Sequence, residues 1–223
     1  MNRKAGKNGE RGEAAAQREL RGFKTLGTFR RVSLPIVSPA YLQRRATVAQ
    51  ARWLLGKHLV RRHADGRMEA RIITETEAYD GEGDLACHAR VGRTNRTEVM
   101  YAAGGVWYVY LCYGVHEMLN LVVGPAEWPA AVLIRGLEGV SGPGRLTRAL
   151  GIGRHLNGAA AFDPVSGLWI EDRGVRVAPR AIVAGPRVGV EFAGPVWAAK
   201  PWRFSLNADP RGGPARRRAP TRG

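Results

Sequence analysis

Two carboxylates and a tyrosine occupy alternate positions in one short segment, Thr74-Glu75-Thr76-Glu77-Ala78-Tyr79. Because successive side chains of a strand point to opposite faces, Glu75, Glu77 and Tyr79 would share one face. Two acids on one strand face are costly against a core unless each is hydrated, paired or functional. The segment is therefore either the exposed polar face of an edge strand or part of a functional site.

A histidine and a group of arginines follow this segment within twenty residues. Residues 80–89 are rich in glycine and acidic side chains and include His88, and residues 90–96 carry three arginines among small residues. Arg93 and Arg96 on this run are candidates for contacts to phosphate groups. A carboxylate, a histidine and a phosphate-binding loop so close together predict a site on a loop beside a strand end.

A third group of candidates lies on an aromatic, β-branched segment, residues 106–113, which ends at Gly114 and is typical of a strand that runs into a turn. By alternation Tyr108 and Tyr110 share a face, whereas Tyr113 can point elsewhere from the tip of a hairpin. The residues alone favour ordinary strand packing for Tyr108. They leave Tyr110 and Tyr113 open between packing and a role in a site.

The elements that must position these residues are mostly strands. We predict a helix over 42–55 with Thr47 as a cap, a hairpin of 57–62 and 67–79 that turns at Asp65-Gly66, strands over 106–113, 115–123, 130–137 and 187–192, and a short helix over 143–150. Together they predict an α+β fold, a single domain with a central, mostly antiparallel, curved β-sheet and flanking helices.

The composition indicates a polyanionic partner. The 223 residues include 35 Lys and Arg against 19 Asp and Glu, a formal net charge of +16. Residues 1–31 hold nine basic and three acidic side chains, and residues 205–223 hold five and one. We expect both ends to be disordered basic tails, either solvated ends or electrostatic tethers to phosphates, around a domain spanning 32–204. That domain stays basic without them.

Several classes of protein are excluded by what the sequence contains. Cys87 and Cys112 are its only cysteines, too few for a disulfide scaffold, a four-cysteine zinc site or an iron–sulfur cluster. The histidines show no ligand spacing, so we expect no metal and no cofactor. The chain has no apolar run long enough to span a membrane and no signal peptide, which predicts an intracellular protein, cytoplasmic and nucleoid-associated if bacterial, without membrane contact.

Taken in order, the motifs resemble the alkyladenine (3-methyladenine) DNA glycosylase family. The segments that carry the resemblance are Glu75 to Tyr79, His88, Arg93 to Arg96, Tyr108 to Gly114, Asn120, Leu133 to Arg135, Gly142-Pro143 and Arg187 to Val190. It runs from about residue 46 to about residue 204 and leaves out both tails. Any one motif would be weak, whereas the ordered series is specific.

The resemblance implies a base excision repair enzyme that acts as a monomer on double-stranded DNA containing damaged purines. Such an enzyme flips an alkylated or deaminated purine, with 3-methyladenine and hypoxanthine as candidates, out of the duplex. It hydrolyses the N-glycosidic bond with an activated water and leaves an abasic site. Glu77 would activate the water, and Arg135 would orient water or phosphate beside it, unless Arg135 is only a structural ion pair. Lys57 and Lys200, which could form a Schiff base, lie away from the motifs, and the family that the chain resembles uses water. Both points indicate a monofunctional enzyme.

The same resemblance assigns roles to the other candidates. Tyr79, Tyr110 and His88 would hold the flipped base, Asn120 would lie on the pocket wall and discourage the exocyclic amine of guanine, and Tyr113 would fill the space that the base leaves in the stack. Stacking on aromatic side chains is worth about 1–3 kcal/mol per base, enough to offset much of the cost of flipping.

Two other classes stay open on the sequence. A non-catalytic nucleic-acid-binding module would account for the charge and the tyrosines. An RNA-directed enzyme or translation factor of similar fold would also use stacking aromatics. Glu77 counts against a simple binder, because a carboxylate on a face that meets phosphates repels them.

Overall fold

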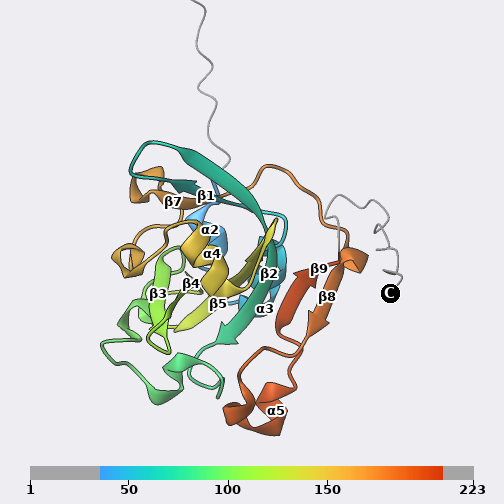
Figure 1. Ribbon diagram of the computed structural model, residues 1–223. Helices are drawn as coiled ribbons and strands as arrows, with labels where there is room; N and C mark the ends of the chain where they lie inside the picture. The colour runs from blue at the N-terminus through green and yellow to red at the C-terminus, as the bar shows by residue number, and fades with distance from the viewer. Residues whose placement is uncertain (1–35, 208–223) are drawn as a thin grey trace, which may run out of the picture. The chain divides into compact units, whose positions relative to one another are not determined.

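The structure is a computed structural model that describes residues 36–207 (Figure 1). The tail predicted over 1–31, and that over 205–223 from residue 208 on, lie outside the described residues. Strand β9, Arg203–Leu206, continues past the boundary predicted at residue 204. Its partners in the sheet are β2, Met68–Asp80, and β8, Ile182–Gly185.

The predicted hairpin is confirmed and supplies the longest strand of the sheet. Strands β1, His58–Arg62, and β2 pair in antiparallel register on either side of the Asp-Gly turn. Gly66 takes a φ of +82°, which only glycine adopts without strain, and the Asp65 carboxylate accepts a hydrogen bond from the Arg67 N–H at 3.0 Å. Strand β2 runs on past β1 and forms the middle of the sheet.

The sheet is antiparallel throughout its described pairings and curved, as predicted, and its main strand order is β3-β4-β5-β2-β1-β7 (Figure 1). The remaining strands are β3, Trp107–Cys112; β4, His116–Val123; β5, Ala130–Leu137; β6, Val140–Ser141; and β7, Leu168–Glu171. Glu75 to Glu77 of β2 lie between β5 and β9, with an irregularity in the register to β5 at Glu75. The carboxylates are therefore central in the sheet, and the edge-strand interpretation is wrong.

The α-helices of the described residues are short, and they are α2, Pro39–Leu42; α3, Thr47–Leu54; α4, Pro143–Ala149; and α5, Gly194–Ala198. Single turns of 3₁₀ helix cover His88–Val91, Glu98–Tyr101, Arg154–Leu156, Pro164–Ser166, Pro179–Ala181 and Glu191–Ala193. The helix predicted over 42–55 is thus divided. Thr47 is the first residue of α3 and does not cap it, because Ala46 holds the N-cap position; the Thr47 hydroxyl donates to Asp80 Oδ1 at 2.6 Å.

The strand predicted over 187–192 is also wrong. Gly189 has a φ of +73°, outside the range of a strand, and a 3₁₀ turn follows it. Alternate side chains of β2 point to opposite faces, as predicted. Thr76 points toward helix α3: it is fully buried, and its hydroxyl donates to the Ala51 carbonyl of α3 at 2.8 Å. Helix α3 therefore covers one face of β2 and leaves the face of Glu75 and Glu77 to other segments.

The junction of α2 with the sheet yields a stability prediction. A Cβ on Gly104 would lie 2.3 Å from the Leu42 carbonyl oxygen and 3.0 Å from the Val123 Cα, both backbone atoms. We expect Gly104→Ala to lower the free energy of unfolding by about 1–3 kcal/mol. Gly83→Ala, where no atom lies within 4 Å, should change it by less than about 0.5 kcal/mol. Denaturant unfolding of both variants is the measurement, and equal values would contradict the close approach.

Candidate active site

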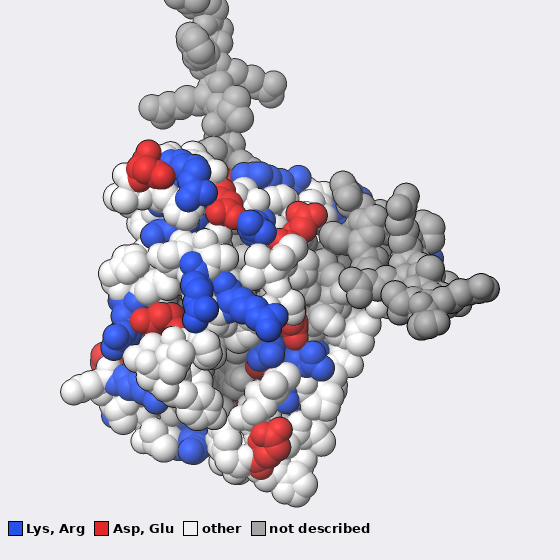
Figure 2. Space-filling model, viewed as in Figure 1, with Lys and Arg blue, Asp and Glu red and all other residues white. Residues whose placement is uncertain are grey.

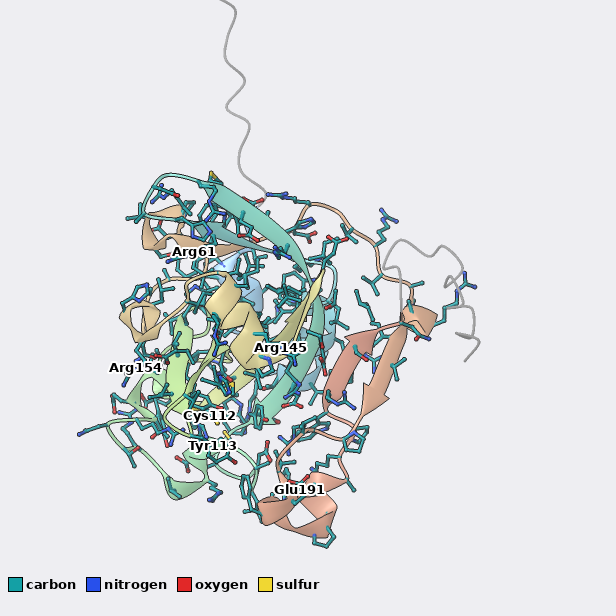
Figure 3. The ribbon with its side chains drawn as sticks, in the orientation of Figure 1. Arg61, Cys112, Tyr113, Arg145, Arg154 and Glu191 are labelled. Atoms are coloured by element: carbon teal, nitrogen blue, oxygen red, sulfur yellow. The ribbon has the colours of Figure 1, made fainter. Side chains whose placement is uncertain are left out.

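A cavity of about 550 Å³ opens beside the end of β2, within the range of small-molecule sites. Its walls come from β2, β3, β4, β5, the turn at His88 and residues 188–192. Lys and Arg side chains gather across the middle of the face in Figure 2, where Figure 3 labels Arg145. Figure 3 also labels Cys112 and Tyr113, which line the cavity where β3 ends. The cavity therefore lies on a basic face.

The carboxylate of Glu77 is fully buried, with no exposed surface. Its Oε1 accepts a hydrogen bond from the Val188 N–H at 2.8 Å, and its Oε2 accepts one from the Tyr79 hydroxyl at 2.8 Å. Arg135 Nε lies 3.4 Å from Oε1. These three partners line the cavity and Glu77 does not, so its carboxylate lies directly behind the cavity wall.

Burial and neighbouring positive charge shift the pKa of this carboxylate in opposite directions. Burial raises the pKa of Glu77 above its ordinary value, and Arg135, the Val188 N–H and the Tyr79 hydroxyl partly counteract the rise. A carboxylate whose proton affinity is raised in this way is suited to take a proton from water near neutral pH.

Arg135 pairs with Glu75 and Glu77 of β2, so the ion-pair interpretation of this residue is confirmed. Its Nε lies 3.2 Å from Glu75 Oε1 as well as 3.4 Å from Glu77. Arg203 of β9 adds a second cation 3.1 Å from Glu75 Oε1. Because Arg135 also lines the cavity, the pairing leaves its predicted role beside Glu77 open.

Three of the predicted base-binding residues meet at the cavity as aromatic surfaces. Tyr79, His88 and Tyr110 all line it, and the ring centres of His88 and Tyr110 lie 4.6 Å apart at 74°. Tyr108 is 2% exposed, which confirms strand packing for most of this side chain, yet its hydroxyl lies 3.0 Å from His88 Nδ1. The sequence reasoning missed that support of His88.

His88 has an unusual proton affinity for an imidazole. Burial, together with Arg96 and Arg90, lowers the pKa of His88 from 6.5 to about 4. The Arg96 guanidinium lies 3.4 Å from His88 Nε2 and can only donate, so Nε2 accepts and Nδ1 carries the proton that it donates to Tyr108. At neutral pH His88 is uncharged and has no proton to spare for a leaving group.

Asn120 is buried in the cavity wall, whereas Tyr113 is exposed at the rim. Asn120 is 4% exposed, lines the cavity and donates both amide hydrogens to carbonyls, of Tyr108 at 3.2 Å and of Met118 at 3.3 Å. Only its carbonyl oxygen is free for a ligand. Tyr113 is 93% exposed, on a turn where its φ is +50°, which is uncommon outside glycine. Its ring stands at the cavity rim, and core packing is excluded.

The two predicted phosphate-binding arginines differ in their surroundings. Arg93 Nη2 donates to both oxygens of Glu127 at 2.7 Å. Arg96 lies over the Tyr110 ring, 4.9 Å from its centre, and lines the cavity. Arg96 is thus part of the site itself, whereas Arg93 is engaged in an ion pair at the surface.

The lysines lie elsewhere. Lys57 Nζ pairs with Asp172 at 2.8 Å, and Lys200 Nζ lies 3.7 Å from the centre of the Trp197 ring. Neither lines the cavity. Within residues 36–207, no group of three His, Cys, Asp or Glu side chains could hold a metal ion. No helix in that same range is long and apolar enough to cross a membrane.

The sequence reasoning also missed the part that residues 188–192 play in the site. Val188 supplies the backbone donor to Glu77, and Phe192, 64% exposed, forms part of the cavity wall. The motif Arg187-Val188-Gly189-Val190 was visible in the sequence. Its interpretation as a strand concealed the backbone N–H that it turns toward β2.

The comparison with protein families matches this domain. A family model described as methylpurine-DNA glycosylase (MPG) covers residues 41–141 and 138–210, which include every residue of the cavity wall. The protein is therefore a DNA glycosylase, a hydrolase of N-glycosidic bonds that binds DNA and acts in DNA repair by base excision. The chain belongs to the methylpurine-DNA glycosylase family.

Relatives from distant microorganisms agree with this assignment, and they share the name "Putative 3-methyladenine DNA glycosylase". A protein of Psychrobacter cryohalolentis is 43% identical, over 75% of this chain and 89% of its own length. One of Anaeromyxobacter dehalogenans (strain 2CP-C) is 49% identical, over 75% and 82%. One of Methanocella arvoryzae is 45% identical, over 75% and 91%.

The surroundings of His88 yield a prediction about its titration. NMR of the imidazole should show a midpoint near pH 4, because burial and two arginines disfavour the charged form. Arg96→Ala should raise the midpoint and leave it below 6.5, since burial is the larger cause and remains. A midpoint near 6.5 in the unmodified protein would contradict the buried, neutral imidazole.

Proposed function

We propose that this glycosylase removes methylated purines, 3-methyladenine foremost, from double-stranded DNA, and that it acts as a monofunctional, monomeric hydrolase. The observation that carries the proposal is the buried Glu77 carboxylate directly behind an aromatic cavity. The names of the relatives support the choice of base. Because its substrate is genomic DNA, the protein would work inside the cell, at the nucleoid in a bacterium, and its basic ends would add phosphate contacts.

The cavity suits a flat, positively charged base. A flipped purine would lie among Tyr79, Tyr110 and His88, and stacking worth about 1–3 kcal/mol per base would offset much of the cost of unstacking. An alkylated purine carries a positive charge, which the faces of tyrosine rings attract. Asn120 would lie at an edge of the base, where its bulk in the cavity wall, and not its hydrogen bonding, would discourage the exocyclic amine of guanine.

The state of His88 favours a cationic leaving group. A methylated purine departs as a neutral base and needs no proton, whereas hypoxanthine leaves readily only when protonated. Neutral His88 cannot supply that proton at pH 7. Hypoxanthine would accordingly be the slower substrate of the two.

Glu77 would serve as the general base. Its Oε1 already accepts from Val188 and lies beside Arg135, while Oε2 accepts from Tyr79 alone among residues 36–207 and keeps a second lone pair. A water bound at Oε2 would give its proton to Glu77 as its oxygen bonds to C1′. The bond from C1′ to the base nitrogen would break with its electron pair moving to the base. Before that proton transfer, the carboxylate charge would stabilise the positive charge that develops on the sugar.

The rim residues would hold the duplex open. Tyr113 would enter the stack in place of the flipped base, and Arg93 and Arg96 would contact the phosphates beside it, with Arg93 exchanging Glu127 for the backbone. Because both lysines of the domain lie off the cavity, water would be the only nucleophile and an abasic site the product.

Replacing Glu77 tests the mechanism and the class of protein together. We expect Glu77→Gln to lower the rate of base release from methylated duplex DNA by about 100-fold or more, with binding to the lesion nearly unchanged. Glu75→Gln is the matched control, since Glu75 shares Arg135 but does not contact Tyr79 or Val188. Near-normal release by Glu77→Gln would remove Glu77 from the reaction. If the unmodified protein releases no base without added metal, the interpretation that remains is a non-catalytic nucleic-acid-binding module.

Replacing Tyr113 tests the wedge. Tyr113→Ser removes the ring that would fill the stack, so excision of a stably paired lesion should fall by about 10- to 100-fold. Excision from a mismatch or a single strand, where flipping costs little, should fall much less. Tyr113→Phe keeps the ring and should behave like the unmodified protein. The melting temperature should not change, because the side chain is exposed. An equal loss on all substrates would exclude the wedge.

A further inference from the structure

A second buried ion pair lies beneath the site, and the mechanism above does not use it. The side chains of Arg187 and Asp84 have no exposed surface, and Arg187 Nη2 donates to Asp84 Oδ1 at 2.9 Å. Moving two charges out of water is costly, and apolar side chains of similar volume often stabilise a protein as well or better. Arg187 Nε is also buried and finds no hydrogen-bond partner among the described residues. Stability alone therefore gives little reason for this pair.

Arg187 and Asp84 contact the segment of β2 that carries Glu77 and Tyr79. Arg187 Nη1 donates at 2.9 Å to the carbonyl of Ala78, the residue between Glu77 and Tyr79. The Arg187 guanidinium carbon lies 4.9 Å from the centre of the Tyr79 ring. Asp84 in turn accepts from the Ala86 N–H at 3.0 Å and the Asp80 N–H at 3.2 Å. One guanidinium thus contacts the backbone between the carboxylate and the ring, and also the ring itself.

The pair also anchors the backbone on one side of Val188. The Val188 N–H donates to Glu77 Oε1 at 2.8 Å, yet the Val188 side chain is 52% exposed and Gly189 follows with a φ of +73°. Residues 187–192 form no strand, so no ladder of hydrogen bonds sets the direction of this N–H. Val190 is buried and holds the segment beyond Gly189, and Arg187 is the anchored residue directly next to Val188.

We propose that Arg187 and Asp84 are positioning residues for base excision, which fix the Val188 N–H on Glu77 and the ring of Tyr79 against the cavity. This inference rests on the proposed role of Glu77 as the general base. Neither residue lines the cavity, and both act through groups that do.

The effect on Glu77 passes through Val188. The groups that face Glu77 are Glu75 and Tyr79 on its own strand, Arg135 on β5 and the Val188 N–H, with Arg203 of β9 paired to Glu75. While Arg187 and Asp84 are paired, their opposite charges largely cancel at Glu77. Loss of the Val188 hydrogen bond would raise the pKa of Glu77 further, because a donor to the carboxylate favours its charged form. As the pH falls, the ionised base would then be lost at a higher pH.

The experiment is a pH profile of base release under single-turnover conditions, with methylated duplex DNA. We expect Arg187→Met to move the acid limb of the profile up by about one to two pH units, from the loss of one hydrogen bond to a charged group together with the negative charge of the unpaired Asp84. Arg187→Lys, which keeps the charge without the paired geometry, should move it less. Lys57→Met breaks the ion pair with Asp172 away from the cavity and should leave the limb in place.

A double variant keeps the test decisive if Arg187→Met does not fold with Asp84 left unpaired. Arg187→Met with Asp84→Asn removes both charges, and we expect a folded protein with the shifted limb. A wild-type limb in either folded variant, whether or not its melting temperature falls, would overturn the positioning role. Glu77→Gln in the same assay separates the two proposals. If Glu77→Gln loses base release while the Arg187 variants keep the acid limb of the unmodified protein, only the positioning role is rejected. If Glu77→Gln releases base normally, the role of Glu77 as general base is rejected.

Discussion

Burial of the Glu77 carboxylate is the constraint on which the rest of this site depends. A carboxylate without exposed surface stays ionised only if donors replace the water that it has lost. Those donors come from three places in the chain: the Tyr79 hydroxyl on the same strand, Arg135 on β5 and the Val188 N–H after β8. The fold must bring all three to one point before the carboxylate can take part in any chemistry.

The sheet order satisfies this constraint. Placing β5 directly against β2 brings Arg135 across to the acids, and the return of the chain through β8 and β9 along the other side of β2 brings Val188 to them. Helix α3 covers the opposite face, where the Thr76 hydroxyl holds it. The acids therefore meet polar groups on their own side, while the apolar core lies on the other.

The face around the cavity is basic, and aromatic rings line its interior. Lys and Arg side chains gather on the face that Figure 2 shows, where an anionic backbone would be attracted. Inside, Arg96 lies over the Tyr110 ring and Arg135 is paired with Glu77, while His88 is neutral at pH 7. In the proposed mechanism the neutral His88 also explains why a base that leaves without a proton would be excised fastest.

The sequence by itself determined the local elements: the Asp-Gly hairpin, the strands over 106–113 and 130–137, and the shared face of Glu75, Glu77 and Tyr79, because alternation and turn chemistry act between near neighbours. Its ordered motifs also indicated the family. Only the tertiary structure decided that Glu77 is buried, that Arg135 pairs with both acids and that residues 187–192 turn a backbone N–H toward β2. Those facts depend on contacts between residues 58 to 111 positions apart, and no local pattern specifies which N–H meets which carboxylate.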